Sequence, residues 1–284
     1  RSLAKLRHRH IVSIHEVGEA GAHLYYSMDL IEGGTLASLL RDGPLTAARS
    51  VRLMRQVASA VAYSHGQGVV HRDLKPGNVL IDSSGDAYVA DFGLAQDLGA
   101  IGDLTSTGRM LGTPDYMAPE QARGDSARIG EPCDVYALGA ILYACLTGVA
   151  PFEHLALADK MHAVVYDDPV PPRKHNPTVP RGLEVVCLKA LTKDPEKRYA
   201  NVQAMLQDLE RFEEGHAVLA RLPGPFARLV RALDRQRPAI AVALIMGVLF
   251  AWTIWSGQER GAGFAGRRTS AVFFWGSELI LDQI

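Results

Sequence analysis

Residues 71–78, with the sequence His-Arg-Asp-Leu-Lys-Pro-Gly-Asn, constrain the fold of this chain more than any other stretch. An apolar pair, Val69-Val70, precedes them, and an apolar run, Val79 to Ile81, follows them. Short apolar runs on either side of a polar, Pro- and Gly-containing segment predict a loop held between two short strands.

This loop carries three chemically different side chains within a few residues of one another. They are the carboxylate of Asp73, the ammonium group of Lys75 and the amide of Asn78. A base, a phosphate contact and a metal ligand together suit the transfer of a phosphoryl group to a hydroxyl, a reaction that depends on positioning and charge stabilisation. The alternative interpretation is a polar turn with an incidental aspartate.

Further motifs follow in a fixed order. Asp91-Phe92-Gly93 comes after a second apolar run, and Gly112-Thr113-Pro114 and Ala118-Pro119-Glu120 come later. Together with residues 71–78, which match the pattern H-R-D-L-x-x-x-N, they resemble the serine/threonine protein kinases, and most closely the bacterial receptor-type group. Lys75-Pro76 is similar to the serine/threonine-type form of the loop.

The resemblance covers residues 1–213 and implies an α+β, two-lobe fold. A few antiparallel strands, at about 11–17 and 23–30, would remain from an incomplete small lobe, joined to a mostly helical large lobe. Residues 1–8 resemble the last turns of the helix that the family calls αC. By the family's spacing, its glycine-rich loop, strand lysine and αC glutamate would fall before Arg1.

The resemblance also implies catalytic roles, with ATP and Mg²⁺ as cofactors. Asp73 would accept or orient the proton of the attacking hydroxyl, and Lys75 would steady the transferring phosphate. Asn78 and Asp91 would hold Mg²⁺, with Asp91 as the main ligand.

The same resemblance places the nucleotide base. Met28 would be the gatekeeper, Asp29 to Ile31 the hinge that meets adenine through backbone groups, and Leu80 the floor beneath it. Gly33 and Gly34 predict a bend between the lobes. From the residues alone, an ordinary strand-to-helix turn explains this stretch equally well.

Residues 94–117 resemble a kinase activation segment. Thr105 and Thr107 would be phosphorylated, and Arg72 would pair with that phosphate. Thr113 would lie near residues 71–78, which correspond to the catalytic loop of the family, and would help select hydroxyl substrates. Two alternatives stay open: a structural salt bridge for Arg72, and an unmodified polar loop for the threonines.

Structural roles are implied for three more residues. Glu120 would pair with Arg198, and Asp134 would reach back to the backbone of the catalytic loop. Asp134 lies in residues 132–147, which are apolar almost all round and predict a buried helix. Amphipathic periodicity predicts another helix at 46–66, capped by Thr46, and further helices follow at about 155–166, 181–192 and 201–213, with a proline-rich connection at 168–180.

Composition excludes one class of partner and suggests a compartment. The 284 residues have a formal net charge of −1, so no basic excess points to nucleic acid. Cys133, Cys145 and Cys187 lie far apart, without C-x-x-C spacing, which favours buried, reduced thiols in a cytosolic domain.

The chain changes character after residue 213. Residues 214–237 form a basic linker, and residues 238–256 contain no charged side chain. A helix of this length would measure about 28 Å, enough to cross a bilayer once, with Trp252 and Trp255 near one interface. The preceding arginines favour a cytoplasmic kinase domain, although arginines also follow; a buried or surface-lying helix is the alternative. Residues 257–284 match no pattern.

Two hypotheses for function follow. The first is a membrane-anchored enzyme that transfers the ATP γ-phosphate to serine or threonine hydroxyls of protein substrates. The second is an impaired, kinase-like scaffold at the membrane, because the small-lobe motifs that cradle ATP are not in this sequence. By analogy with the family, either is compatible with a homodimer.

Overall fold

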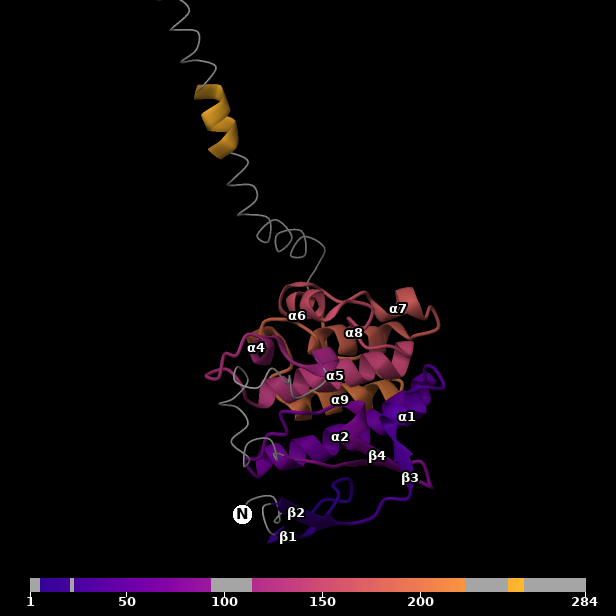
Figure 1. The fold of residues 1–284 in the computed structure, drawn as a ribbon. Helices are drawn as coiled ribbons and strands as arrows, with labels where there is room; N and C mark the ends of the chain where they lie inside the picture. The colour runs from indigo at the N-terminus through magenta and orange to yellow at the C-terminus, as the bar shows by residue number, and fades with distance from the viewer. Residues whose placement is uncertain (1–5, 21–22, 93–113, 223–244, 253–284) are drawn as a thin grey trace, which may run out of the picture. The chain divides into compact units, whose positions relative to one another are not determined.

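The computed structural model describes residues 6–20, 23–92, 114–222 and 245–252. The chain forms two compact units, Arg1–Leu222 and Pro223–Ile284. In Figure 1 the described part of the first unit has strands on one side of helix α2 (Ala47–Gly66) and most of the other helices on the opposite side. This arrangement agrees with a small strand-containing lobe on a helical large lobe.

The small lobe contributes one antiparallel hairpin. Strand β1 (Ile14–Ala20) pairs with β2 (His23–Met28), with Ala20 opposite His23. The first predicted strand, 11–17, began too early: Ile11 instead forms an isolated parallel bridge with Val89. The expected helical end of residues 1–8 is also wrong for residues 6–8, which are irregular, while residues 1–5 lie outside the described part.

A three-stranded sheet lies between this hairpin and helix α2 in Figure 1. Its order is β3 (Gly33–Thr35), β4 (Val79–Asp82), β5 (Ala87–Val89), all antiparallel. The bend predicted at the two glycines is therefore a strand. A Cβ atom on Gly33 would lie 2.1 Å from the backbone oxygen of Ile81, so only glycine permits this close pairing.

Helix α2 has the predicted limits because its ends are capped. The hydroxyl of Thr46 accepts a hydrogen bond from the N–H of Arg49 at the first turn. At the other end, Gly68 has a φ of 73°, and the N–H of Val69 donates to the carbonyl of Ser64. The strand predicted at Val69-Val70 is wrong, because this N–H closes the helix and the two valines pair with none of the described strands.

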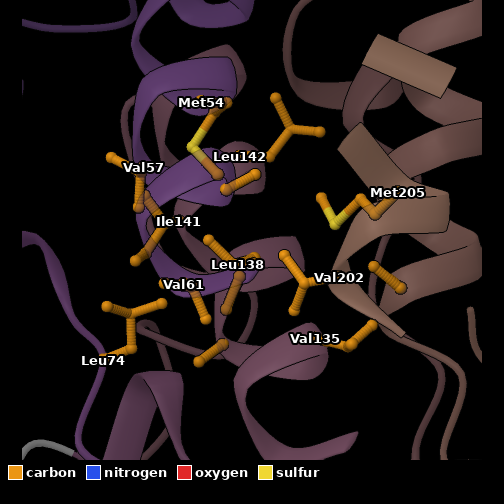
Figure 2. Packing of buried hydrophobic residues seen from close by; sticks show 14 of the residues in the cluster. Met54, Val57, Val61, Leu74, Val135, Leu138, Ile141, Leu142, Val202 and Met205 are labelled. Atoms are coloured by element: carbon orange, nitrogen blue, oxygen red, sulfur yellow. The ribbon is translucent and has the colours of Figure 1, made fainter. Parts of the chain in front are cut away.

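Helix α5 (Glu131–Thr147) is the centre of the large lobe. It is buried from Cys133 to Leu146, as its apolar sequence predicted, and Gly148 ends it with a φ of 81°. Figure 2 shows Leu138 and Leu142 packed among side chains of α2 and α9 (Val202–Glu213). Helix α5 therefore packs against both α2 and α9 in the core.

The remaining elements surround α5. α8 (Arg181–Ala190) packs on it so closely that Gly139 faces Ala190 without room for a side chain. The proline-rich segment contains one short helix that periodicity missed, α7. All three cysteines are buried and free, which confirms the prediction of buried, unpaired thiols. The other elements are α1 (Leu36–Leu40), η2 (Pro76–Asn78), η3 (Pro114–Tyr116), α4 (Pro119–Ala122), α6 (Leu157–Tyr166), α7 (Pro172–His175) and η4 (Pro195–Lys197).

Little of the tail falls within the described residues. Residues 245–252 are helical, and the rest of the predicted span at 238–256 lies outside them. Among the residues that the structure describes, no helix has the length and apolar character needed to cross a membrane. Residues 257–284 and most of the basic linker are also outside the described part.

Candidate active site

The loop at residues 71–78 is hydrogen-bonded to the side chain of Asp134, in the first turn of α5. Its carboxylate is fully buried and accepts hydrogen bonds from the backbone N–H groups of His71 and Arg72, each at 2.8 Å. Nε2 of His65 donates to the same carboxylate at 2.7 Å. Arg72 has a φ of 67°, which costs free energy for a residue with a side chain, and these charge-assisted bonds offset that cost.

His71 ties the loop to the end of strand β5. Its Nε2 lies 3.0 Å from the carbonyl oxygen of Ala90, and its ring centroid lies 4.8 Å from that of Phe92. Because a carbonyl only accepts, Nε2 carries the proton, and in the neutral ring Nδ1 is left as an acceptor. The N–H of Asp73 faces this Nδ1 at 3.4 Å, so the histidine also orients the next turn of the loop.

The three chemical groups of the loop converge. Nζ of Lys75 lies 2.6 Å from Oδ2 of Asp73. Nδ2 of Asn78 donates to the backbone oxygen of Asp73 at 2.8 Å and approaches its Oδ2 at 3.3 Å. The Asp73 side chain is 45% exposed, so it is accessible from solvent. The amide oxygen of Asn78 accepts no hydrogen bond from any described residue.

Asp91 lies next to this group because of the sheet register. Val79 pairs with Val89, and the N–H of Ala90 donates to the carbonyl of Asn78 at 2.9 Å. The residues that follow β5 therefore lie beside the residue that precedes β4. Asp91 has a φ of 59°, a left-handed conformation that is uncommon for a residue other than glycine.

Tyr26 contacts Asp91 from the hairpin. Its hydroxyl donates a hydrogen bond of 2.7 Å to Oδ1 of Asp91. This bond to the carboxylate, with smaller effects of burial and of the negative charge, raises the pKa of Tyr26 to about 12. The second oxygen of Asp91, Oδ2, receives no hydrogen bond from any described residue.

These oxygens fit a magnesium ion that arrives with a nucleotide. Mg²⁺ prefers oxygen ligands and is usually held by one or two carboxylates together with substrate phosphates. Asn78 and Asp91 each offer an uncommitted side-chain oxygen. Within the described ranges, no three His, Cys, Asp or Glu side chains gather into a metal cage of their own. The donor set therefore suits a metal shared with phosphate rather than a closed protein site.

The residues expected around the nucleotide base lie on two parts of the chain, the end of strand β2 with the residues that follow it, and strand β4. Met28 ends β2 and lines a small apolar cavity with Tyr26, Asp91 and Phe92. The backbone N–H of Asp29 donates to Ser13, and its carboxylate pairs with Nε2 of His15 at 2.8 Å.

Ile31 and Leu80 are the other two residues expected around the base. The N–H and C=O of Ile31 form no hydrogen bond with the described residues, so both are available to a ligand. Leu80 is partly exposed on β4, between Thr35 of β3 and Tyr88 of β5.

The backbone of Arg72 forms hydrogen bonds, whereas its guanidinium Nε forms none with the described residues. Its carbonyl accepts a hydrogen bond of 2.7 Å from Nε2 of Gln121. Its Nε is buried and has no partner among the described residues. A buried, unpartnered donor on a cation favours an anionic partner. The expected partners, Thr105 and Thr107, lie outside the described residues, as does Thr113.

The pair expected between Glu120 and Arg198 is present and buried. Two parallel bonds of 2.7 Å join the guanidinium to the carboxylate, and further bonds of Arg198 reach backbone carbonyls, including that of Pro132. Burial acts to raise the pKa of Glu120, but the bonds and charge of Arg198 outweigh it, and the net pKa is lowered. The pair joins α4, the start of α5 and the residue that ends η4.

Comparison with known proteins agrees with this geometry. Residues 1–209 match the protein kinase domain. The chain belongs to the protein kinase domain family. It is 35% identical over 285 residues to serine/threonine-protein kinase PknB of Mycolicibacterium smegmatis, covering 97% of this chain and 43% of that protein.

Two other relatives show the same pattern. The chain is 37% identical to PknB of Mycobacterium tuberculosis over 76% of its own length and 35% of the relative's. It is 37% identical to serine/threonine-protein kinase PrkC of Bacillus subtilis over 74% of its own length and 32% of the relative's. The chain thus spans less than half the length of these relatives.

Sequence reasoning missed three residues that shape the site. His65 and Gln121 bond to Asp134 and to the Arg72 carbonyl, and neither lies in a recognisable motif. For Tyr26 a signal existed: in a strand it shares a face with Met28, two positions later, which was already assigned to the nucleotide site. Strand alternation was therefore enough to place its side chain on the same side.

Proposed function

We propose that the protein carrying this chain is a serine/threonine protein kinase, which transfers the γ-phosphate of ATP to protein hydroxyls. The observation that carries the proposal is the convergence of Asp73, Lys75 and Asn78 within hydrogen-bond distance, beside Asp91. Fold and family alone do not establish an activity, whereas this group of side chains has the chemistry that phosphoryl transfer needs.

Each side chain has a separate task. Asp73 accepts or orients the proton of the substrate hydroxyl, and its exposed position permits contact with a protein substrate. Lys75 carries a positive charge beside that carboxylate and steadies the phosphate as it moves. Asn78 and Asp91 hold the magnesium ion, which supplies charge neutralisation to the phosphate oxygens when it is bound with ATP.

The base of the nucleotide would lie along the hinge. The free backbone groups of Ile31, together with Asp29, suit the edge of adenine, and Leu80 offers an apolar surface below it. Met28 limits the depth of this site, next to Phe92. Such a mixture of an apolar surface and a few polar groups is typical of cofactor sites.

Phosphorylation would regulate the enzyme through Arg72. The buried Nε of Arg72, which has no partner within the described ranges, is suited to a phosphate on Thr105 or Thr107. Because Arg72 adjoins Asp73, such a contact would connect the activation segment with the base. Thr113 would complete this segment near the acceptor hydroxyl.

The tail would anchor the enzyme. Residues 238–256 would cross the membrane once, with residues 214–237 as a basic cytoplasmic linker, so that the kinase domain would face the cytoplasm. Protein substrates would be reached near the membrane, and two copies of the chain would be able to pair there.

Substitution of the base tests the proposal. In the full-length protein, Asp73→Asn should lower phosphotransfer to a protein substrate by about 10²–10⁴-fold, because general base catalysis contributes this much. Nucleotide should still bind, since Asn78 and Asp91 are unchanged. Asp125→Asn is the matched control, because Asp125 is a surface carboxylate paired with Arg128.

Two results would decide against it. Equal turnover in wild type and Asp73→Asn would remove Asp73 as the base. If the wild-type protein neither binds nucleotide nor transfers phosphate, that result would instead favour the hypothesis of a kinase-shaped scaffold.

A further inference from the structure

Two adjacent tyrosines on strand β2 have different partners. The hydroxyl of Tyr26 donates to Oδ1 of Asp91 at 2.7 Å, across 65 positions of sequence. The hydroxyl of Tyr25 reaches Glu16 on the neighbouring strand at 3.5 Å. Because successive side chains in a strand point to opposite faces, only Tyr26 faces the active site.

The backbone around Asp91 is well held, but its carboxylate is not. Ala90 is bonded to Asn78, and Phe92 packs on the ring of His71. Among the described residues, Tyr26 is the only hydrogen-bond partner of the Asp91 side chain. Rotation of that carboxylate about its side-chain bonds is therefore limited mainly by one phenol.

We propose that Tyr26 is a positioning residue that orients the Asp91 carboxylate for the magnesium ion of a bound nucleotide. Its hydroxyl holds Oδ1 and leaves Oδ2 open for the metal. Groups that hydrogen-bond a metal ligand fix its orientation, and their loss typically lowers metal affinity by about 10–100-fold. This inference rests on the proposed function, since it assigns Asp91 to Mg²⁺.

The contact does not block the metal site. A carboxylate has about four acceptor positions, and the phenol occupies one of them. The remaining positions, including both on Oδ2, accept no hydrogen bond from the part of the chain that the structure describes. The bond also joins the β1–β2 hairpin to the end of β5, so the position of the hairpin sets the orientation of Asp91.

Tyr26→Phe tests this role because it removes only the hydroxyl. Binding of ADP to the full-length protein would be measured by calorimetry over a series of Mg²⁺ concentrations, and again with EDTA. We expect the apparent affinity for Mg²⁺ to fall about 10-fold, while ADP affinity in EDTA stays unchanged. Mn²⁺ binding in the presence of ADP, followed by electron paramagnetic resonance, should weaken in parallel.

Tyr25→Phe is the matched control. It makes the same chemical change one residue away, on the other face of β2, and should leave the Mg²⁺ dependence as in wild type. Thermal unfolding of both variants shows whether either substitution disturbs the fold. A structural role for Tyr26 would lower ADP affinity equally with and without Mg²⁺.

Several results would overturn the inference. Unchanged Mg²⁺ affinity in Tyr26→Phe would show that the phenol does not orient Asp91, and tighter binding would show that it competes with the metal. An equal loss in EDTA would make the residue structural. In each case, intact Mg²⁺-dependent ADP binding by the wild type would leave the proposed function standing; its absence in the wild type would overturn both proposals.

Discussion

Replacement of Asp134 by asparagine should release the catalytic loop without leaving a cavity. Asp134 is fully buried and accepts bonds from His71, Arg72 and His65. Asparagine has nearly the same shape but only one acceptor oxygen. Its NH₂ group must therefore face at least one of the donors, most simply the N–H of Arg72, which bonds to Oδ1 alone.

The magnitude follows from these contacts. A hydrogen bond to a charged group contributes about 1.5–3 kcal/mol, and a buried donor left without a partner costs about 1–3 kcal/mol. Loss of the Arg72 bond, with two donors then facing each other, should lower the free energy of unfolding by about 2.5–6 kcal/mol. Because Arg72 holds a left-handed φ of 67°, the loop should also relax locally and turnover should fall.

Urea denaturation and steady-state phosphotransfer would measure the two effects of Asp134→Asn. Glu131→Gln is a suitable control: Glu131 lies in the same turn of α5, 46% exposed and 3.6 Å from Nδ1 of His65. We expect it to change unfolding by less than about 0.5 kcal/mol. If Asp134→Asn unfolds within 1 kcal/mol of wild type (roughly the size of one hydrogen bond) and keeps full turnover, the reasoning is refuted.

Three further changes probe the large lobe. Glu120→Gln should lower the free energy of unfolding by about 3–5 kcal/mol in urea, because it leaves the charge of Arg198 buried without its partner. In wild type this contribution is present above the unfolded-state pKa of Glu120 and is lost as the pH falls through its lowered folded-state pKa. Burial lowers the pKa of Lys193 to about 7, so the unfolded chain binds more protons above that pH and stability should rise with pH. Lys193→Met should remove this rise, which approaches about 1.4 kcal/mol per pH unit between the folded-state pKa of about 7 and the unfolded-state pKa of about 10.4, in denaturation series at each pH. Gly139→Ala should cost about 1–3 kcal/mol in thermal unfolding, because its Cβ would lie 2.7 Å from that of Ala190.

Each of these has its own contrary result. Full stability of Glu120→Gln at neutral pH would mean that water or other groups replace the pair, whereas partial recovery in a double Glu120→Met, Arg198→Met variant is expected. A pH dependence that Lys193→Met leaves unchanged would assign it to other groups. Gly66→Ala is the control for Gly139→Ala: a Cβ there meets nothing within 4 Å, so that variant should be neutral or stabilised.

Local patterns were sufficient for the long helices. Thr46 and the spacing of apolar residues located α2, and the continuous apolar sequence of α5 predicted a buried helix. Local patterns failed where a strand forms only because it pairs with a segment that is distant in the sequence. The glycines at 33 and 34 form a strand because Asp82 and Ile81 lie opposite them, and Val69-Val70 does not because it pairs with none of the residues that the structure describes. Short strands depend on neighbours that a local window does not contain.

The sequence by itself located the candidate chemical groups: Asp73, Lys75, Asn78 and Asp91 were recognisable because residues 71–78 and 91–93 resemble motifs of the protein kinases. Only the tertiary structure decided what orients them. Asp134 lies 62 positions from Arg72, and Tyr26 lies 65 positions from Asp91. Hydrogen bonds act over about 3 Å in space, and no local pattern encodes which distant residue the fold will bring within that distance.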